Sequence, residues 1–237
     1  MNIVKKIRIK LNSLLNFYLF QWGGIPKVRK EEISKSVFKK YLPAEPVIVD
    51  CGAYDGYDTT QLAKILKGKI HAFEPIDDIF VRLKQNTAPY RNVSCYNLAL
   101  SNNSGKQYFF VSEGQSDASS SFLEPKDHLL DHPDTVFTKR IEVEAVTLDK
   151  WAEQNNIGRV DMLWLDMQGF ELAMLKASVN ILNSVKLIHT EVSTRETYKG
   201  VPLYKEYREF LESRGFSVVI EAIPKGWDMG NVLFARI

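Results

Sequence analysis

The sequence predicts an α/β fold in which a mostly parallel sheet is flanked by helices. From residue 45 onward, short runs rich in β-branched and aromatic residues alternate with stretches of helical apolar spacing. The chain has 237 residues, 45% of them hydrophobic and 25% charged, a composition typical of one large soluble domain. Its formal net charge of +2 creates no strong field, so the composition argues against a nucleic acid as partner.

The predicted elements follow one another as strand and helix, with turn residues between them. Pro46 marks the start of the first strand, Gly68 follows the first helix, and the strand at 162–165 is the most apolar of the chain. We expect strands at residues 47–50, 69–73, 93–96, 140–146, 162–165, 185–192, 218–220 and 232–235. We expect helices at residues 61–66, 77–86, 171–177 and 203–214, with a short one from Asp149.

The stretch after the third strand is predicted to be an insertion made of a β-hairpin and a loop. Residues 97–112 are typical of a hairpin, with the run Asn-Asn-Ser-Gly at 102–105 as its turn. Residues 113–137 are irregular and rich in Ser, Asp and Pro. This composition predicts either a lid or binding loop, or a disordered surface segment.

Residues 1–44 are predicted to form a basic, helical amino-terminal arm, and residues 45–237 a single domain. The first forty residues hold ten Lys and Arg but two acidic residues, and apolar residues recur at helical spacing between Ile3 and Trp22. We expect this amphipathic helix to pack on its own domain or to form a homodimer. Peripheral contact with an anionic membrane surface is the alternative.

Cysteine usage and the amino-terminal residues predict a cytoplasmic protein. Cys51 and Cys95 are too few for a disulfide framework and lack metal-ligand spacing. No continuous apolar run near the amino terminus is long enough for a signal peptide or a membrane span. Peripheral attachment at the inner membrane surface stays open as the alternative location.

The strongest functional signal is the turn at residues 50–56, between a strand and a helix. Gly52 permits a tight turn and close approach of a ligand, and the N–H groups of the following helix face the same space. Glu74 ends the next strand, 22 residues after Gly52, where an acidic side chain can accept the hydroxyls of a ribose. The G-x-G-x-x-G spacing of dinucleotide enzymes is absent. The pattern therefore favours another nucleoside ligand, with a glycine turn that binds nothing as the alternative.

Six motifs in a fixed order carry a resemblance to a known family. They are residues 47–53 (VIVDCGA) with Gly56, 73–75 (FEP), 97–101 (NLALS) with Gly105, 146–149 (VTLD), 165–171 (LDMQGFE) and 191–192 (EV). Over residues 45–237 the chain resembles the FkbM-type methyltransferases, which are S-adenosylmethionine-dependent O-methyltransferases. It departs from their pattern at Tyr54, where Asn is usual, and at Gln168, where Glu is usual.

The resemblance implies a Rossmann-like class I methyltransferase fold with a seven-stranded sheet. It also implies S-adenosylmethionine as cofactor and S-adenosylhomocysteine as product. The residues expected to bind the cofactor are Asp50, Gly52, Ala53, Gly56, Glu74, Pro75, Asn97, Leu98, Ala99 and Asp166. We assign the backbone at Gly52 and Ala53, together with the Asp50 carboxylate, to the methionine end, and residues 97–99 to the adenine.

Three side chains are candidates for the catalytic proton acceptor. In an open α/β sheet the ligand lies beyond the carboxyl ends of the strands, where the strand order reverses, so Asp166 should face the methyl donor. His189 and Glu191 share one face of the next strand. The structural alternatives are a helix-capping role for Asp166, a hydrogen-bonded core position for His189, and neutralisation of Arg195 by Glu191. We predict no metal site, with a divalent ion shared by Asp166 and Glu191 as the minor alternative.

The class of molecule that accepts the methyl group is inferred from the family resemblance, because the residues themselves do not indicate it. The family suggests a hydroxyl of a sugar or glycan precursor, either nucleotide-activated or part of a surface polysaccharide. One alternative is O-methylation of a non-sugar secondary metabolite. The other is a non-catalytic, methyltransferase-like binding protein.

Overall fold

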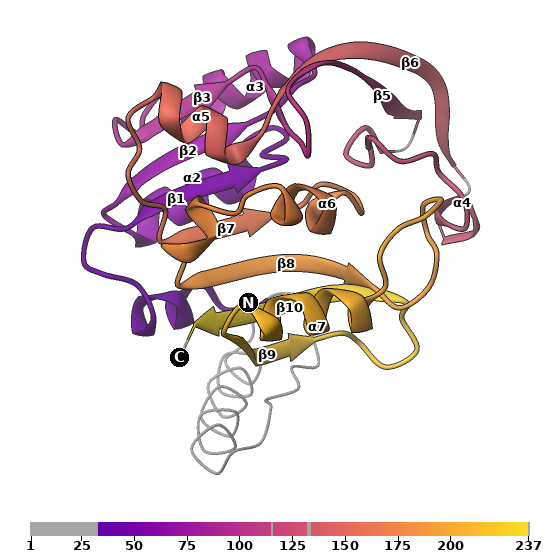
Figure 1. The fold of residues 1–237 in the computed structure, drawn as a ribbon. Helices are drawn as coiled ribbons and strands as arrows, with labels where there is room; N and C mark the ends of the chain where they lie inside the picture. Colours follow the sequence, from indigo (N-terminus) through magenta and orange to yellow (C-terminus); the bar gives the residue numbers. More distant parts are fainter. Residues whose placement is uncertain (1–32, 115, 132–133, 237) are drawn as a thin grey trace, which may run out of the picture.

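The computed structural model describes residues 33–236 except 115, 132 and 133 (Figure 1). A seven-stranded sheet has the strand order β3-β2-β1-β7-β8-β10-β9. Its strands are β1 (Val47–Cys51), β2 (Lys69–Phe73), β3 (Val93–Tyr96), β7 (Met162–Leu165), β8 (Leu187–Ser193), β9 (Phe216–Ala222) and β10 (Met229–Arg236). β10 runs antiparallel to β8 and β9, and the other neighbouring strands are parallel. The predicted fold class is confirmed.

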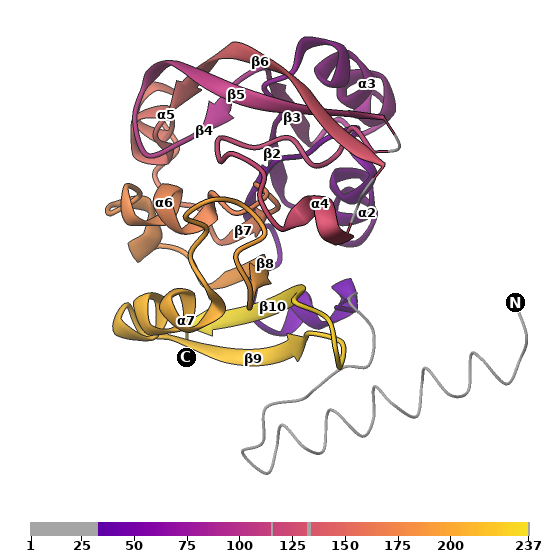
Figure 2. The same ribbon diagram turned by 90° about the vertical axis from the view of Figure 1, so that its right-hand side faces the viewer.

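Helices cover both faces of this sheet. They are η1 (Lys35–Lys40), α2 (Tyr57–Ile65), α3 (Asp77–Thr87), α4 (His128–Asp131), α5 (Leu148–Gln154), α6 (Glu171–Lys176), η2 (Ile181–Asn183) and α7 (Tyr204–Ser213). Figure 2 shows α5, α6 and α7 on one side of the sheet and α2 and α3 on the other. The helix predicted at 61–66 begins earlier, at Tyr57, because Gly56 adopts a left-handed conformation with φ 86° and serves as its N-cap.

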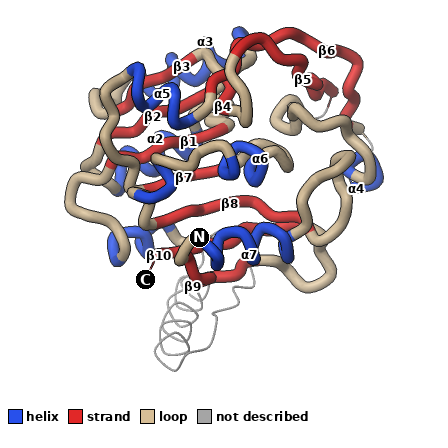
Figure 3. Tube along the Cα trace, viewed as in Figure 1, coloured by secondary structure: helices blue, strands red, loops and turns tan. Residues whose placement is uncertain are grey.

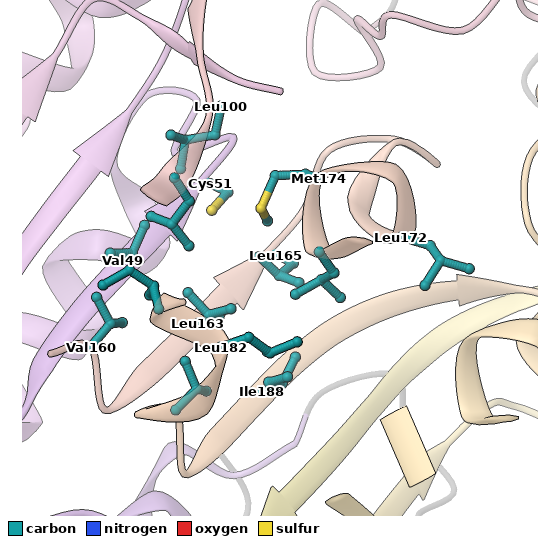
Figure 4. Close-up of a cluster of buried hydrophobic side chains, with 14 of the residues drawn as sticks. Val49, Cys51, Leu100, Val160, Leu163, Leu165, Leu172, Met174, Leu182 and Ile188 are labelled. Atoms are coloured by element: carbon teal, nitrogen blue, oxygen red, sulfur yellow. The ribbon is translucent and has the colours of Figure 1, made fainter. Parts of the chain in front are cut away.

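Alternate residues of the central strands point to opposite faces and form two hydrophobic clusters. Val49, Leu163 and Ile188 belong to the cluster that packs against α5, α6 and α7 (Figure 4). Ile48 and Met162 point the other way and pack against η1 and α2. Full burial of each such side chain contributes about 1.5–3 kcal/mol. The two clusters hold the strand ends, and therefore the loops after them, in fixed positions.

A second sheet forms the insertion and has the strand order β4-β6-β5. Its strands are β4 (Ala99–Leu100), β5 (Gly105–Gly114) and β6 (Thr135–Val146). The predicted hairpin at 97–112 is wrong in its pairing, because β4 and β5 do not pair with each other. β4 pairs parallel to β6, and β5 pairs antiparallel to β6. The hairpin of the insertion is thus β5–β6, and it shortens the irregular segment predicted at 113–137.

The order of the main sheet reverses between β1 and β7, as the sequence predicts. Asp50 lies opposite Trp164 in the register, and Trp164 lies opposite His189 on β8. In Figure 1, β1, β7 and β8 point toward the side that carries α4. Figure 3 shows long loops gathered on that same side. The carboxyl ends of the strands therefore meet the loops of the insertion.

The chain before β1 contributes to the domain core. Ile33 and Phe38 are buried, and Phe38 contacts Trp164 and His189 edge to face. The predicted amphipathic helix, dimer contact and membrane contact fall on residues 1–32, which lie outside the described residues. Within the part of the chain that the structure describes, no helix is both long and apolar enough to cross a membrane.

Candidate cofactor and active site

A cavity of about 340 Å³ lies at the carboxyl ends of β1, β2 and β7, beside the reversal of strand order. Its floor and walls come from the ends of these strands and from the connection between β3 and β4. The helices α2 and α3 add Asp58 and Ile79, and the insertion adds Phe109 on β5 and Asp117, Ser120 and Phe122 of the segment after it. Elements far apart in the sequence therefore enclose one space.

The glycine turn after β1 provides close approach of backbone. Gly52 has φ 78°, a conformation that favours glycine, and a Cβ atom there would lie 1.9 Å from the Asp166 carbonyl oxygen. The N–H groups of Gly52 and Ala53 both donate to the Phe73 carbonyl oxygen, at 3.2 and 2.9 Å. The turn thus contributes space at the cavity floor, while its amide donors are used to hold β1 beside β2.

Asp50 supplies a buried carboxylate to the same floor. Thr59 Oγ1 donates to Asp50 Oδ2 at 2.5 Å, whereas Oδ1 has no hydrogen-bond partner among the described residues. Burial raises the pKa of Asp50 to about 7. A buried carboxylate with one unsatisfied oxygen at a cavity is suited to a cationic hydrogen-bond donor such as an ammonium group.

Glu74 follows β2 and is 5% exposed. Its Oε1 accepts a hydrogen bond from the Ile76 backbone N–H at 2.8 Å, which fixes the carboxyl at the cavity wall. Burial raises the pKa of Glu74 to about 8. A carboxylate in this position can accept hydrogen bonds from a pair of ribose hydroxyls.

An apolar section of wall adjoins Glu74. Ile76, Ile79, Leu98, Phe109 and Phe122 line it, and the two phenylalanine rings meet edge to face at 4.8 Å. Apolar and aromatic side chains of this kind accommodate a flat, hydrophobic ring system. The polar and apolar halves of the wall together suit a nucleoside.

Gln168 connects two carboxylates at the far end of the cavity. Its Nε2 donates to Asp166 Oδ1 at 2.8 Å and to Glu191 Oε2 at 3.4 Å. Its Oε1 accepts from the Tyr198 hydroxyl at 3.0 Å. Gln168 adopts φ 51°, so the turn presents its amide in a backbone conformation uncommon for this residue type. The amide thereby holds the Asp166 and Glu191 side chains in a fixed relation.

Asp166 faces the cavity, and α6 does not use it as a cap. Met167 N and Gly169 N both donate to Glu171 Oε1, at 2.8 and 3.3 Å, so Glu171 fills the role considered for Asp166. The Asp166 side chain is accessible from the cavity, yet the protein atoms packed around it desolvate the carboxyl and raise its pKa. The hydrogen bond from Gln168 acts in the opposite direction.

The segment after β5 is tied down at both ends of the cavity. Asp117 accepts hydrogen bonds from the Tyr54 hydroxyl and, at 2.6 Å, from Arg82 Nη2. At the other end, Ser121 Oγ donates to the Gln168 carbonyl oxygen at 2.8 Å, and the Tyr198 hydroxyl donates to the Ser119 carbonyl oxygen. The segment therefore covers the cavity as an ordered wall.

The structure brings most of the predicted cofactor residues together. Those that line the cavity are Asp50, Gly52, Ala53, Glu74, Pro75, Leu98, Ala99 and Asp166. Gly56 and Asn97 lie outside the lining. Gly56 caps α2, and Asn97 Nδ2 donates to Asp77 Oδ1 at 2.7 Å. Their predicted contacts with the cofactor stay predictions.

Of the three proton-acceptor candidates, the cavity lining includes Asp166. His189 is 5% exposed and stacks on Trp164, with ring centroids 3.7 Å apart and an interplanar angle of 6°. Burial lowers the pKa of His189 to about 3. Its placement under η1 agrees with the core alternative, although Nδ1 finds no hydrogen-bond partner among the described residues. Glu191 reaches the site through Gln168.

Residues 113–137 were predicted as a lid or binding loop or as a disordered surface segment, and the structure agrees with the first alternative, but sequence reasoning did not identify the residues of this segment that line the cavity. Asp117, Ser120 and Phe122 line the cavity but belong to the segment predicted as irregular, and no local motif singles them out. The aromatic residues Tyr54 and Trp164 also line the cavity. In the described ranges, no group of three or more His, Cys, Asp or Glu residues is arranged to hold a metal ion.

These residues fit S-adenosylmethionine. The unsatisfied Asp50 Oδ1 matches the methionine ammonium, the buried Glu74 carboxylate matches the ribose hydroxyls, and the apolar wall matches the adenine. The absence of a side chain at Gly52 leaves the floor open for the methionine chain.

Comparison with known proteins points the same way. The sequence pattern of the methyltransferase FkbM domain matches residues 50–218. The 2-O-methyltransferase NoeI of Sinorhizobium fredii is 30% identical over 216 residues, which cover 87% of each chain.

A solved structure with 16% sequence identity shows the same fold. The Methanococcus jannaschii fibrillarin pre-rRNA processing protein has a TM-score of 0.50 and 16% identity, over 81% of this chain and 67% of its own. An Aeropyrum pernix fibrillarin with natively bound S-adenosylmethionine has a TM-score of 0.49 and 12% identity, over 83% of this chain and 69% of the fibrillarin chain. With its domain match and its relative of similar extent, this chain belongs to the FkbM methyltransferase family and is an S-adenosylmethionine-dependent methyltransferase.

Proposed function

We propose that the enzyme methylates a hydroxyl group of a sugar, in a glycan or a glycan precursor. The observation that supports a hydroxyl as the methyl acceptor is the position of Asp166. Its carboxylate lies at the cavity, and the Gln168 amide donates a hydrogen bond to one of its oxygens. A carboxylate so placed can take the proton of a hydroxyl as its oxygen attacks. The name of the relative NoeI, a 2-O-methyltransferase, supports the same chemistry.

The polarity of the cavity wall favours a sugar over an apolar metabolite. Side-chain oxygen atoms at this wall come from Asp55, Asp58, Asp117, Ser120 and Gln168, of which Asp58 also pairs with Lys35 and Asp117 with Arg82. Several acceptors at one wall suit a ligand with several hydroxyl groups. Because carboxylates repel phosphate, this wall favours an uncharged sugar unit inside the cavity, with any diphosphate of an activated precursor outside it.

The chain's residues have three tasks in the reaction. When bound, the cofactor supplies a methyl group on a positively charged sulfur, which an oxygen nucleophile attacks in line. Asp166 accepts the hydroxyl proton, while Gln168 keeps the carboxyl oriented. The segment that carries Ser120 and Phe122 covers the cavity and limits entry of water. The oxygen–methyl bond forms as the sulfur–methyl bond breaks, and the proton ends on the Asp166 carboxylate.

The experiment is a screen of acceptors with release of S-adenosylhomocysteine as the readout. The panel contains neutral oligosaccharides, nucleotide sugars, phenolic polyketides and amines. We expect turnover with members of the sugar classes, and preference for neutral oligosaccharides is expected from the acidic wall. A preference for polyketides or amines over every sugar would contradict the proposal.

A variant separates catalysis from binding. Asp166→Asn keeps the shape of the side chain but cannot accept a proton as a carboxylate does. We expect it to lose turnover while its affinity for S-adenosylhomocysteine changes less than about tenfold, or 1.4 kcal/mol. Cofactor binding without turnover on any acceptor class, in the wild-type protein, would favour the non-catalytic alternative.

A further inference from the structure

Lys35, on the 3₁₀ helix η1, brings a positive charge to the edge of the cavity. Its Nζ lies 2.6 Å from Asp58 Oδ1 and 4.8 Å from the centre of the Trp164 ring. Asp58 and Trp164 both line the cavity. The Lys35 side chain is 12% exposed, so its ammonium is held between these two groups and not extended into solvent.

The buried phenylalanine of η1 fixes this arrangement. Phe38 packs edge to face against Trp164, with ring centroids 6.0 Å apart, and η1 contacts α2, the helix that carries Asp58. Lys35 therefore arrives at the site from the chain before β1, on a helix anchored to the domain core. Its position is set by packing as well as by charge.

The cavity itself is acidic. Its lining contains the carboxyl groups of Asp50, Asp55, Asp58, Glu74, Asp117 and Asp166, and no Lys or Arg is found among the lining residues that the structure describes. The methionine end of the cofactor carries a carboxylate beside its ammonium group. Near the unsatisfied Asp50 Oδ1, which suits the ammonium, that carboxylate meets repulsion unless a cation stands beside it.

We propose that Lys35 binds the α-carboxylate of the methionine end of the cofactor, with Asp58 and Trp164 holding its ammonium at the cavity edge. Arg82 serves elsewhere, because it is paired with Asp117 on the insertion segment. The lysine charge also lies close enough to Asp50 to favour the ionised form of that carboxyl. Asp50 and Lys35 would thus divide the two charges of the amino-acid group between them. This inference rests on the cofactor and not on the acceptor.

The test compares three ligands that differ at the methionine end. S-Adenosylhomocysteine has both charged groups, S-adenosyl-3-thiopropylamine lacks only the carboxylate, and 5′-methylthioadenosine lacks both groups. Isothermal titration calorimetry measures the affinity of the full-length protein for each ligand. The wild-type protein should prefer S-adenosylhomocysteine to the decarboxylated analogue by about tenfold or more, as expected for a charge-assisted hydrogen bond.

Lys35→Met keeps an apolar chain over Trp164 and removes the charge. It should lower the affinity for S-adenosylhomocysteine by about tenfold or more. The affinities for the decarboxylated analogue and for methylthioadenosine should stay within about twofold of the wild-type values. Lys35→Arg should retain the preference for the carboxylate. Lys39→Met, the same change at an exposed position of η1, is the matched control and should bind all three ligands as the wild type does.

Two outcomes overturn the inference. If the wild-type protein binds S-adenosylhomocysteine no more tightly than the decarboxylated analogue, no cation recognises the carboxylate. If Lys35→Met weakens all three ligands equally, the lysine supports the site only by packing or by neutralising Asp58. Because none of these measurements uses an acceptor, failure of the sugar proposal would not affect the result.

Discussion

The backbone of Gly52 lies so close to that of Asp166 that a Cβ atom on Gly52 would sit 1.9 Å from the Asp166 carbonyl oxygen. The contact joins the end of β1 to the end of β7, the two strands between which the sheet order reverses. Since the neighbour is backbone and not a flexible side chain, the two strand ends must separate to admit a methyl group. The cavity floor therefore depends on glycine at this position.

Gly52→Ala should lower the affinity for S-adenosylhomocysteine by at least about tenfold and lower the melting temperature of the protein. Backbone strain alone would cost about 1–2 kcal/mol, because Gly52 has a positive φ. Gly226→Ala is the control, since Gly226 also has a positive φ, 86°, but no atom lies within 4 Å of the position that its Cβ would take. Calorimetry should show wild-type affinity for that control. Equal affinity of both variants would show that the contact with Asp166 does not shape the site.

Glu74→Gln should stabilise the cofactor-free protein in alkaline solution. Burial raises the pKa of Glu74 to about 8 from an ordinary value of 4.5. Its stability contribution is therefore fully present below pH 4.5 and is lost as the pH rises through about 8. The neutral amide has no such dependence and still accepts from the Ile76 N–H. The melting-temperature advantage of the variant should grow between about pH 5 and pH 8.5.

The same variant should bind the cofactor product less well. A glutamine offers the ribose hydroxyls one acceptor oxygen where the carboxylate offers two, so the affinity for S-adenosylhomocysteine should fall by about tenfold. Glu153→Gln, an exposed change on α5, controls for the loss of a negative charge. A variant that is more stable but binds as the wild type does would remove Glu74 from the ribose site.

The local sequence pattern was sufficient to predict most strands and helices of the main sheet, because strand and helix periodicities depend on residues close together in the sequence. The failures occur where distant residues decide. Residues 102 and 103 form a bend and Gly105 begins β5, but the pairing of Ala99 with Ala145 and of Gly105 with the same residue is long-range. Nothing local to residues 97–112 indicates that β6 lies between β4 and β5. The early start of α2 follows from the left-handed Gly56.

The residues of the site also divide into those that local pattern and topology predict and those that depend on long-range packing. Asp50, Gly52 and Glu74 lie at strand ends, where topology alone brings them together. Asp117 lines the cavity and Lys35 lies at its edge only because of the packing of the insertion and of η1, and no sequence motif indicates this packing. His189 is the opposite case, because its position in the strand pattern did not indicate how deeply it is buried. It shares a face with Glu191, but it lies opposite Trp164 in the register and is covered by Phe38, below the open end of the sheet.

Gln168→Leu should move the acidic limb of the pH–rate profile to higher pH. Packing raises the pKa of Asp166, and the Gln168 amide opposes this by donating to the ionised carboxyl. Loss of that donor leaves Asp166 protonated over a wider range, because Asp58 is a negative neighbour that also raises its pKa. The measurement is kcat against pH with a sugar acceptor.

The comparison for this variant is Gln154→Leu, an exposed change on α5 that should leave the profile in place. Asp50, Glu171 and Glu191 also lie near Asp166, so all variants must be compared at one ionic strength. A lower kcat with an unmoved acidic limb would mean that Gln168 affects the reaction without setting the ionisation of Asp166.

Asp117→Ala should speed dissociation of the cofactor product by opening the wall formed by the insertion. Asp117 joins three elements: its own segment, the glycine turn through Tyr54, and α3 through Arg82. Because Asp117 and Arg82 are partly exposed, their ion pair contributes only about 0–1 kcal/mol to folding. The melting temperature should therefore change little, while stopped-flow displacement of S-adenosylhomocysteine should become several times faster.

Glu113→Ala is the matched control for this wall. Glu113, which is partly exposed, pairs with the exposed Lys139 across the β5–β6 hairpin, and both lie outside the cavity lining. That variant should release the product at the wild-type rate, and limited proteolysis should cut the segment carrying Asp117 faster only in Asp117→Ala. Since Asp117 contacts both Tyr54 and Arg82, Tyr54→Phe should give part of the same acceleration. If Asp117→Ala releases the product at the wild-type rate, the segment does not control access to the cavity, and its contacts serve only to order the loop.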